Sequence, residues 1–261
     1  GVVFAGVGLG SVLVGLLALL AAITGWDART AWLLLAAFVL VVTVQGWSTW
    51  SRWSPAVLEA GKGAVRGAKQ AAGQGAASAG PAVPGRQAWI LIVAYGVFGL
   101  GYIVPATFLP VMARKLVDDP LVYGALWPVF GLAAALSTVV VTWRLRAVAP
   151  RTLFVASLIV MAVGVVVPVL HQSILSLVIS ALAVGGTFMV ATMAGLWRGR
   201  QIAVGPPSRL IAAMTAAFAT GQLLGPALVA LGAGQADPLR LPSLLAGALL
   251  VGSAALVRHG H

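Results

Sequence analysis

The chain has 261 residues, of which 61% are hydrophobic and 8% are charged, and its mean hydropathy is +1.04. A soluble domain carries about 25% charged residues, so this composition excludes a soluble globular protein and predicts an all-α protein that crosses a membrane many times. Cysteine is absent and the formal net charge is +11, so we expect no disulfide, no metal site and no cofactor, and we attribute the charge to one side of a bilayer and not to nucleic acid as a partner.

Eight apolar segments of about 20 residues are each long enough to cross the hydrocarbon core of a bilayer. In chain order they cover 2–23, 31–50, 88–112, 123–143, 153–170, 174–197, 209–231 and 241–257. The connections between them are short, except for 51–86, whose Gly, Ala and Ser content is typical of a mobile or weakly helical linker. The sequence therefore predicts two spans in 1–50, a linker in 51–86 and a six-helix part in 87–261.

The charged residues predict the orientation of these spans. When the connections are assigned alternately inside and outside, starting inside, twelve of the 16 basic residues fall inside together with one acid, Glu59. The other four basic residues and the other four acids fall outside. Because cytoplasmic loops carry the excess of Lys and Arg, both ends and the linker 51–86 are predicted to be cytoplasmic in a multi-pass protein of the cell's inner membrane.

The third span contains more than an anchor requires. Its stretch 94–112, AYGVFGLGYIVPATFLPVM, includes glycines, prolines and tyrosines. Tyr95, Gly99 and Tyr102 follow the spacing i, i+4 and i+7, so they share one helix face. The two phenols either pack against neighbouring helices or line a solute site, and the sequence leaves both interpretations open.

Small residues predict where helices approach one another closely. Gly6 and Gly10 in the first span, and Gly221 and Gly225 in the seventh, have the four-residue spacing that lets backbones come into contact in lipid. Pro226 removes one backbone hydrogen bond and is expected to bend its helix. Together with Pro105 these are the predicted packing or hinge positions; a bend of this kind suits both a rocking transporter and a static bundle.

Few polar groups lie within the spans. The candidates for contact with a solute are Tyr95, Tyr102, Thr215, Gln222, Gln45 and Thr187. Thr215, Phe218 and Gln222 share a face, while each glutamine alternatively serves as a hydrogen-bonding contact between helices. No Asp, Glu, Lys or Arg lies in the middle of any predicted span, which favours a neutral or apolar-rich solute, because intramembrane charge usually marks ion coupling.

Several segments together are similar to a known family. They are 1–10 (GVVFAGVGLG) with Trp26 and Trp32, 95–114, 185–189 (GGTFM), 214–215 (MT) and 221–226 (GQLLGP). In combination they resemble the YbfB/YjiJ branch of the major facilitator superfamily. A complete member has twelve helices in two halves, so the resemblance implies that this chain is N-terminally truncated and holds helices five to twelve, with 51–86 as the central loop. Proton coupling through the missing helices is one implied possibility.

The connection after the fourth span departs from the superfamily pattern. It occupies the place of the Gly-x-x-x-Asp-Arg-x-Gly-Arg-Arg loop, and Arg144, Arg146 and Arg151 stand there without the Asp or the glycines. We interpret them as anchors on the cytoplasmic side.

The sequence bears on three classes of function. A secondary transporter that moves a small solute by alternating access fits the resemblance and the midspan polar groups. A non-transporting or channel-like bundle is the alternative, although a pore predicts a continuous polar stripe and the hydroxyls are scattered. An enzyme is not expected, because no nucleophile with a base and no paired carboxylates occur in the spans.

Overall fold

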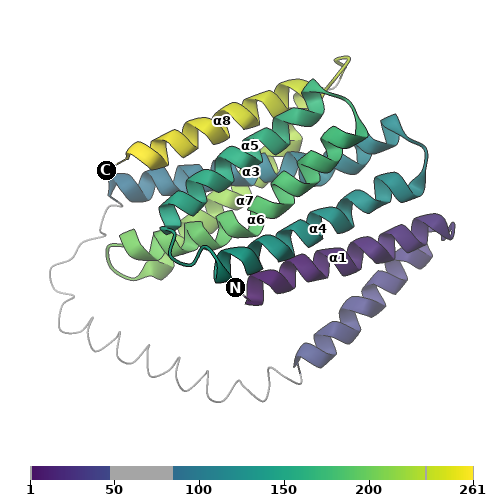
Figure 1. The fold of residues 1–261 in the computed structure, drawn as a ribbon, viewed down its shortest axis with the longest axis horizontal. Helices are drawn as coiled ribbons and strands as arrows, with labels where there is room; N and C mark the ends of the chain where they lie inside the picture. Colours follow the sequence, from purple (N-terminus) through teal and green to yellow (C-terminus); the bar gives the residue numbers. More distant parts are fainter. Residues whose placement is uncertain (1, 48–84, 233, 261) are drawn as a thin grey trace. The chain divides into compact units, whose positions relative to one another are not determined.

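The computed structural model describes residues 2–47, 85–232 and 234–260, and all regular structure in these ranges is helical (Figure 1). The helices are α1 (Val2–Ile23), the helix Ala28–Trp47, α3 (Arg86–Leu116), α4 (Pro120–Trp143), α5 (Pro150–Leu170), α6 (Ile174–Ile202), α7 (Pro207–Leu231) and α8 (Arg240–His259). All eight are long and apolar enough to cross a membrane. The predictions of an all-α fold and of eight candidate spans are confirmed.

The helices differ from the predicted spans mainly at their ends. The second helix begins at Ala28 and not at residue 31, and α6 continues past Arg198 and Arg200 to Ile202. The span limits predicted from the sequence follow the apolar run. A helix can continue beyond that run, because the stem of an arginine lies along apolar surface while its charge stays in water.

The described residues form two compact units. One comprises Gly1–Thr24 and Pro84–His261, so it contains α1 and α3 to α8; the other comprises Gly25–Val83 and contains the helix Ala28–Trp47. Asp27 caps that helix, since its Oδ1 accepts the backbone N–H of Thr30 at 3.4 Å. Hydrogen bonding from Thr30 keeps the pKa of Asp27 below its usual value. Residues 51–84 of the predicted linker 51–86 lie outside the described residues, so the boundaries at 50 and 86 stay predictions.

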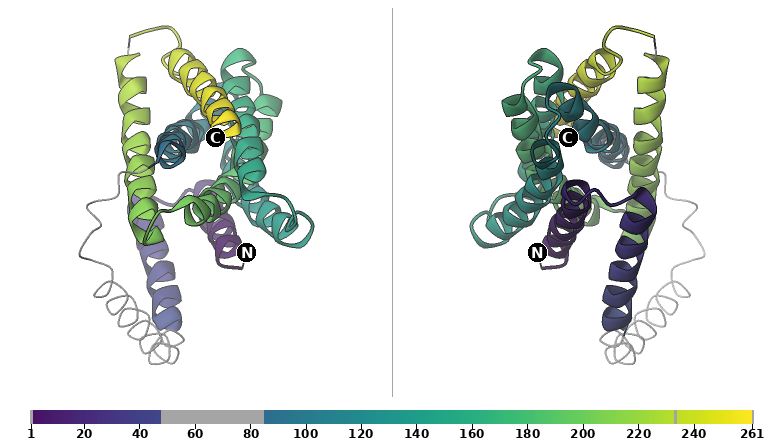
Figure 2. Two further views of the ribbon diagram at one scale, coloured as in Figure 1. Left: turned by 90° about the vertical axis from the view of Figure 1, so that its left-hand side faces the viewer. Right: turned by 90° about the vertical axis from the view of Figure 1, so that its right-hand side faces the viewer.

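Within the first unit, each helix packs against specific partners. α1 lies along α4, α3 along α7, and α5 lies between α6 and α8 (Figures 1 and 2). The core contains large side chains that are fully buried, including Phe98, Phe154, Met161, Met193 and Met214. The unit is therefore a closely packed bundle that can position side chains from five helices around one point.

Gly8 and Gly15 form the close contact of α1 with α4. A Cβ added to Gly15 would lie 2.7 Å from Cδ of Pro128, and a Cβ added to Gly8 would lie still closer to the backbone nitrogen of Ala135. A Cβ on Gly6 or Gly10 would meet nothing within 4 Å among the described residues. The face that approaches α4 thus has a seven-residue repeat, and packing at Gly6 and Gly10 stays a prediction.

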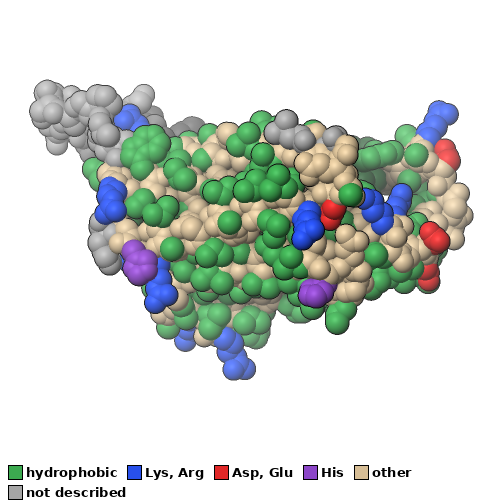
Figure 3. Space-filling model, turned by 90° about the horizontal axis from the view of Figure 1, so that it is seen from above, with side chains coloured by type: hydrophobic (Ala, Val, Ile, Leu, Met, Phe, Trp, Pro, Cys, Tyr) green, Lys and Arg blue, Asp and Glu red, His purple; other side chains and the backbone are tan. Residues whose placement is uncertain are grey.

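Charged side chains separate to the two ends of this bundle. We call one the arginine end; its members are Arg86, Arg144, Arg146, Arg151, Arg198, Arg200, Arg209 and Arg258. The other, the mixed-charge end, carries Arg114, Lys115 and Arg240 with Asp118, Asp119 and Asp237. No described carboxylate of this unit lies at the arginine end. Hydrophobic side chains are distributed along the flank that Figure 3 shows.

The start of α6 offers a direct stability test. Ser173 and Ser176 form a capping box, with Ser176 N–H donating to Ser173 Oγ at 3.2 Å and Ser173 N–H donating to Ser176 Oγ at 3.3 Å. Ser173→Ala is expected to lower the free energy of unfolding by about 1 kcal/mol, because one N-terminal N–H loses its acceptor. Thermal unfolding in detergent measures this, with the exposed Ser208→Ala as control; equal midpoints for the two variants would contradict it.

Candidate functional site

Aromatic rings from five helices meet in the middle of the first unit. They are Tyr95, Phe98 and Tyr102 from α3, Phe130 from α4, Phe154 from α5, Phe188 from α6 and Phe218 from α7. We call this set the aromatic cluster. Phe98 is 0% exposed, and its ring centroid lies 5.0 Å from that of Phe218 and 6.0 Å from that of Phe188. Such separations are typical of attractive ring pairs.

The two tyrosines of the cluster differ in how their hydroxyls are used. Tyr95 is buried, and its hydroxyl donates to the backbone oxygen of Thr192 at 3.4 Å. Tyr102 is half-buried and stacks on Phe188, with centroids 4.0 Å apart and planes 12° apart. The Tyr102 hydroxyl has no hydrogen-bond partner among the described residues, so it remains available to water or to a ligand.

Tyr95, Gly99 and Tyr102 share one face of α3, as the spacing predicts, and the structure directs this face to α7. Both tyrosine rings lie beside Phe218, at centroid distances of 5.7 Å and 6.3 Å. Gly99 lies directly against the backbone of Phe218, and Gly221 directly against the backbone of Gly96. The absence of side chains at these glycines therefore brings the two helices into backbone contact.

Gln222 and Thr215 flank Phe218 on α7. Gln222 is half-buried, and its amide has no hydrogen-bond partner within the described ranges. Thr215 is exposed, and its hydroxyl donates to the backbone oxygen of Ile211 at 2.9 Å. Gln222 thus retains hydrogen-bonding capacity one turn along α7 from Phe218, the ring that lies beside both tyrosines.

The remaining predicted positions are placed as follows. Thr187 is buried, and its hydroxyl donates to the backbone oxygen of Ala183 at 2.6 Å, so it serves its own helix. Gln45 is exposed and belongs to the other compact unit. α3 and α7 continue through Pro105 and Pro226, and Gly225 lies against the Ile103 side chain. A hinge at these prolines stays a prediction.

Sequence reasoning missed most of the aromatic cluster because it searched for polar groups. Four of its phenylalanines have no polar group to mark them: Phe98, Phe130, Phe154 and Phe188. A possible signal was the concentration of rings in the third span, where Tyr95, Phe98 and Tyr102 recur every three to four residues.

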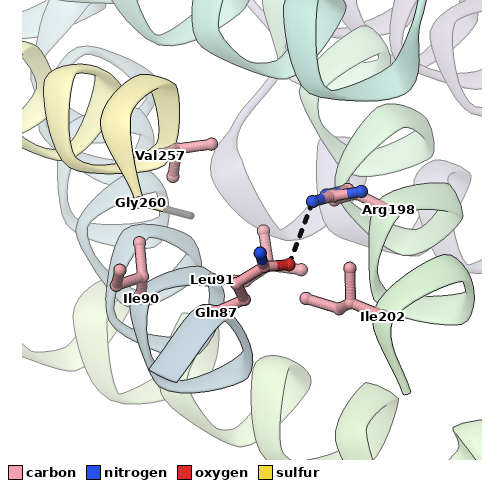
Figure 4. A pocket seen from close by; sticks show the side chains of 7 residues that line it. All are labelled: Gln87, Ile90, Leu91, Arg198, Ile202, Val257 and Gly260. Atoms are coloured by element: carbon pink, nitrogen blue, oxygen red, sulfur yellow. Dashed lines mark hydrogen bonds between the residues drawn. The ribbon is translucent and has the colours of Figure 1, made fainter. Parts of the chain in front are cut away.

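A small pocket lies at the arginine end, between α3, α6 and α8 (Figure 4). Arg198 donates to Oε1 of Gln87 at 3.2 Å across it. The cavity measures about 10 Å³, which is room for about one water molecule and not for an organic solute. Among the described residues, no three His, Cys, Asp or Glu side chains gather where they could hold a metal.

A family model described as "Uncharacterised MFS-type transporter YbfB" matches residues 1–258. The chain belongs to this family. Neither the curated proteins nor the solved structures gave a match to it. The resemblance drawn from the sequence is thereby confirmed, and this YbfB-type chain is a multi-span membrane transporter of the major facilitator superfamily, whose partners are a lipid bilayer and a small solute.

Proposed function

We propose that this YbfB-type transporter is a secondary carrier that moves a small, neutral or apolar-rich solute by alternating access. In this proposal the aromatic cluster, which includes Tyr102, forms one wall of the solute site together with Gln222. The observation that carries it is that the half-buried side chains of Tyr102 and Gln222 have no hydrogen-bond partner among the residues that the structure describes. A polar group without a partner inside a membrane protein is costly unless water or a ligand satisfies it.

The class of solute follows from the chemistry of this wall. Aromatic faces offer apolar contact, and one phenol and one amide offer a small number of directed hydrogen bonds. The middle of each described span contains no Asp, Glu, Lys or Arg, so this wall has no charge to pair with an ionic solute.

The hydroxyl pattern supports a carrier over the channel-like alternative. Thr187, Thr192 and Thr215 all donate to carbonyl oxygens of their own helices. A water-filled pore needs a continuous row of polar groups, and hydroxyls used in this way contribute little to such a row.

The arrangement of the whole carrier is the second part of the proposal. Following the twelve-helix pattern of the superfamily, we place the eight spans as helices five to twelve. Helices one to four would then supply the opposite wall and the group that couples transport to protons. By the positive-inside rule, the arginine end and the linker 51–86 would face the cytoplasm.

Gln222→Leu in the full-length protein tests the solute site. A panel of neutral and apolar-rich compounds is first screened for those that raise the thermal unfolding midpoint, and a compound that does so is used for counterflow in proteoliposomes. Loss of one hydrogen bond of about 1.4 kcal/mol is expected to raise KM about tenfold at unchanged expression. Gln201→Leu, an exposed amide near the end of α6, is the matched control.

Two outcomes would contradict this assignment. Unchanged uptake kinetics for Gln222→Leu would remove Gln222 from the site. Flux that rises linearly with concentration and shows no counterflow would instead favour the channel-like bundle.

A further inference from the structure

An open groove lies between the start of α5 and the end of α8, on the flank of the first unit. Its lining consists of Arg151, Thr152, Val155, Ala156, Ile159 and Arg258. The volume is about 470 Å³, within the range of about 300–1,000 Å³ that ligand sites occupy. The two arginines stand at the arginine end of the helices, whereas Val155 and Ile159 continue along α5 toward the middle of the bilayer.

Arg151 is held in a fixed position at this groove. Its Nε donates to the backbone oxygen of Val257 at 2.8 Å, and its Nη2 donates to the backbone oxygen of Arg258. Both carbonyls belong to the last turn of α8, whose oxygens have no partner within the helix. A guanidinium has five N–H groups, so several donors of Arg151 remain without a partner among the described residues.

The charge around the groove is not balanced within the described part of this unit. The positive charge of Arg151 repels that of Arg198 on the neighbouring α6, and Arg258 adds a third cation. The carboxylates described in the same unit, Asp118, Asp119 and Asp237, all stand at the mixed-charge end. An anion from outside this unit would therefore be bound favourably.

The floor of the groove determines what kind of anion fits. Ile159 is 45% exposed, and Ala156 on the same side of α5 is also exposed. In a spanning helix these side chains face acyl chains, while the arginines one to two turns away reach the headgroup level. A soluble anion would use only the arginines and leave the apolar floor without a contact.

We propose that the groove between α5 and α8 binds one anionic phospholipid of the surrounding membrane. The phosphate accepts hydrogen bonds from Arg258 and Arg151, and one acyl chain lies along Val155 and Ile159. Basic pockets between spanning helices are known to suit anionic headgroups, and hydrogen bonds between guanidinium and phosphate are among the strong ones. Because Arg151 also holds the last turn of α8, the bound lipid connects α5 and α8 at this end.

Native mass spectrometry of the full chain, stripped of lipid in detergent, tests the proposal. Dioleoylphosphatidylglycerol is titrated against dioleoylphosphatidylcholine, which has the same acyl chains. We expect the first lipid to bind at least tenfold more tightly. Arg258→Gln is expected to remove most of this difference, because it deletes the guanidinium of residue 258 and keeps the backbone carbonyls that Arg151 uses. Arg258→Lys is expected to restore part of the difference.

Arg209→Gln is the matched control, because Arg209 is exposed at the same end but does not line the groove. It makes the same change in net charge and is expected to alter lipid affinity less than twofold. Equal losses for Arg209→Gln and Arg258→Gln would show diffuse attraction to the basic end and overturn the proposal. Equal binding of the two lipids, or displacement of the lipid by inorganic phosphate at millimolar concentration, would overturn it as well.

Discussion

Gly221→Leu is expected to be the most damaging single substitution on α7. A Cβ at position 221 would collide with the backbone oxygen of Gly96 and lie 2.8 Å from the backbone nitrogen of Leu100. These are backbone atoms, so no side-chain rotation relieves the clash, and α3 and α7 must separate. We expect a loss of about 3 kcal/mol in the free energy of unfolding, at the upper part of the range for overpacking. Equilibrium unfolding in mixed micelles, followed by tryptophan fluorescence, measures it.

Gly252→Leu provides the control for this experiment. Gly252 lies in the middle of α8, and an added Cβ there would meet nothing within 4 Å. Both substitutions gain the same helix propensity, so their difference isolates the clash at the α3–α7 contact. If both variants unfold at the same denaturant concentration, the close backbone approach at Gly221 is wrong.

Phe98→Ala is expected to have an effect of similar size, because it empties the centre of the aromatic cluster. The Phe98 ring is 0% exposed and lies within 6.5 Å, between centroids, of the rings of Tyr95, Phe154, Phe188 and Phe218. Lipid tails are as apolar as this core, so the cost comes mainly from lost packing and the cavity. We expect about 3 kcal/mol, the low end for this substitution in soluble cores, in the same unfolding measurement.

A second readout distinguishes this cavity from a general loss of stability. Val93→Ala is the control. Val93 lies on the same helix, but its side chain is 53% exposed. The substitution is therefore expected to change the free energy of unfolding by less than about 0.5 kcal/mol. Benzene binds dry apolar cavities of this kind and should raise the unfolding midpoint of Phe98→Ala alone. An unchanged midpoint for Phe98→Ala without benzene would contradict the central position of this ring.

The sequence was sufficient to locate the spans because hydropathy is a local property. The helix predicted at 2–23 is α1 to the residue, and 174–197 gave the start of α6 but not its end. That error has a physical cause: Arg198 and Arg200 stop the apolar run without stopping the helix. Separation of charge to the two helix ends was also predictable, since each connection can be assigned without knowing which helices touch.

Which helices meet could not be predicted in the same way. The spacing of Tyr95, Gly99 and Tyr102 identifies a face, but nothing local states that Phe218, more than a hundred residues later, packs against it. α1 shows the same limit, because Gly6 with Gly10 and Gly8 with Gly15 are both plausible packing faces. The choice between them is made by the shape of α4 at Pro128 and Ala135, which is long-range information.

The separation of charge between the two ends of the first unit has a consequence in an energised membrane. The arginine end carries eight guanidiniums without a described carboxylate, whereas the positive and negative side chains of the opposite end cancel. The net positive charge of the unit is therefore concentrated at one end of its helices. Moving each elementary charge against a potential of 100 mV costs about 2.3 kcal/mol. A resting voltage that is negative on the arginine side consequently opposes any inversion of the protein in the bilayer. This effect continues long after insertion is complete.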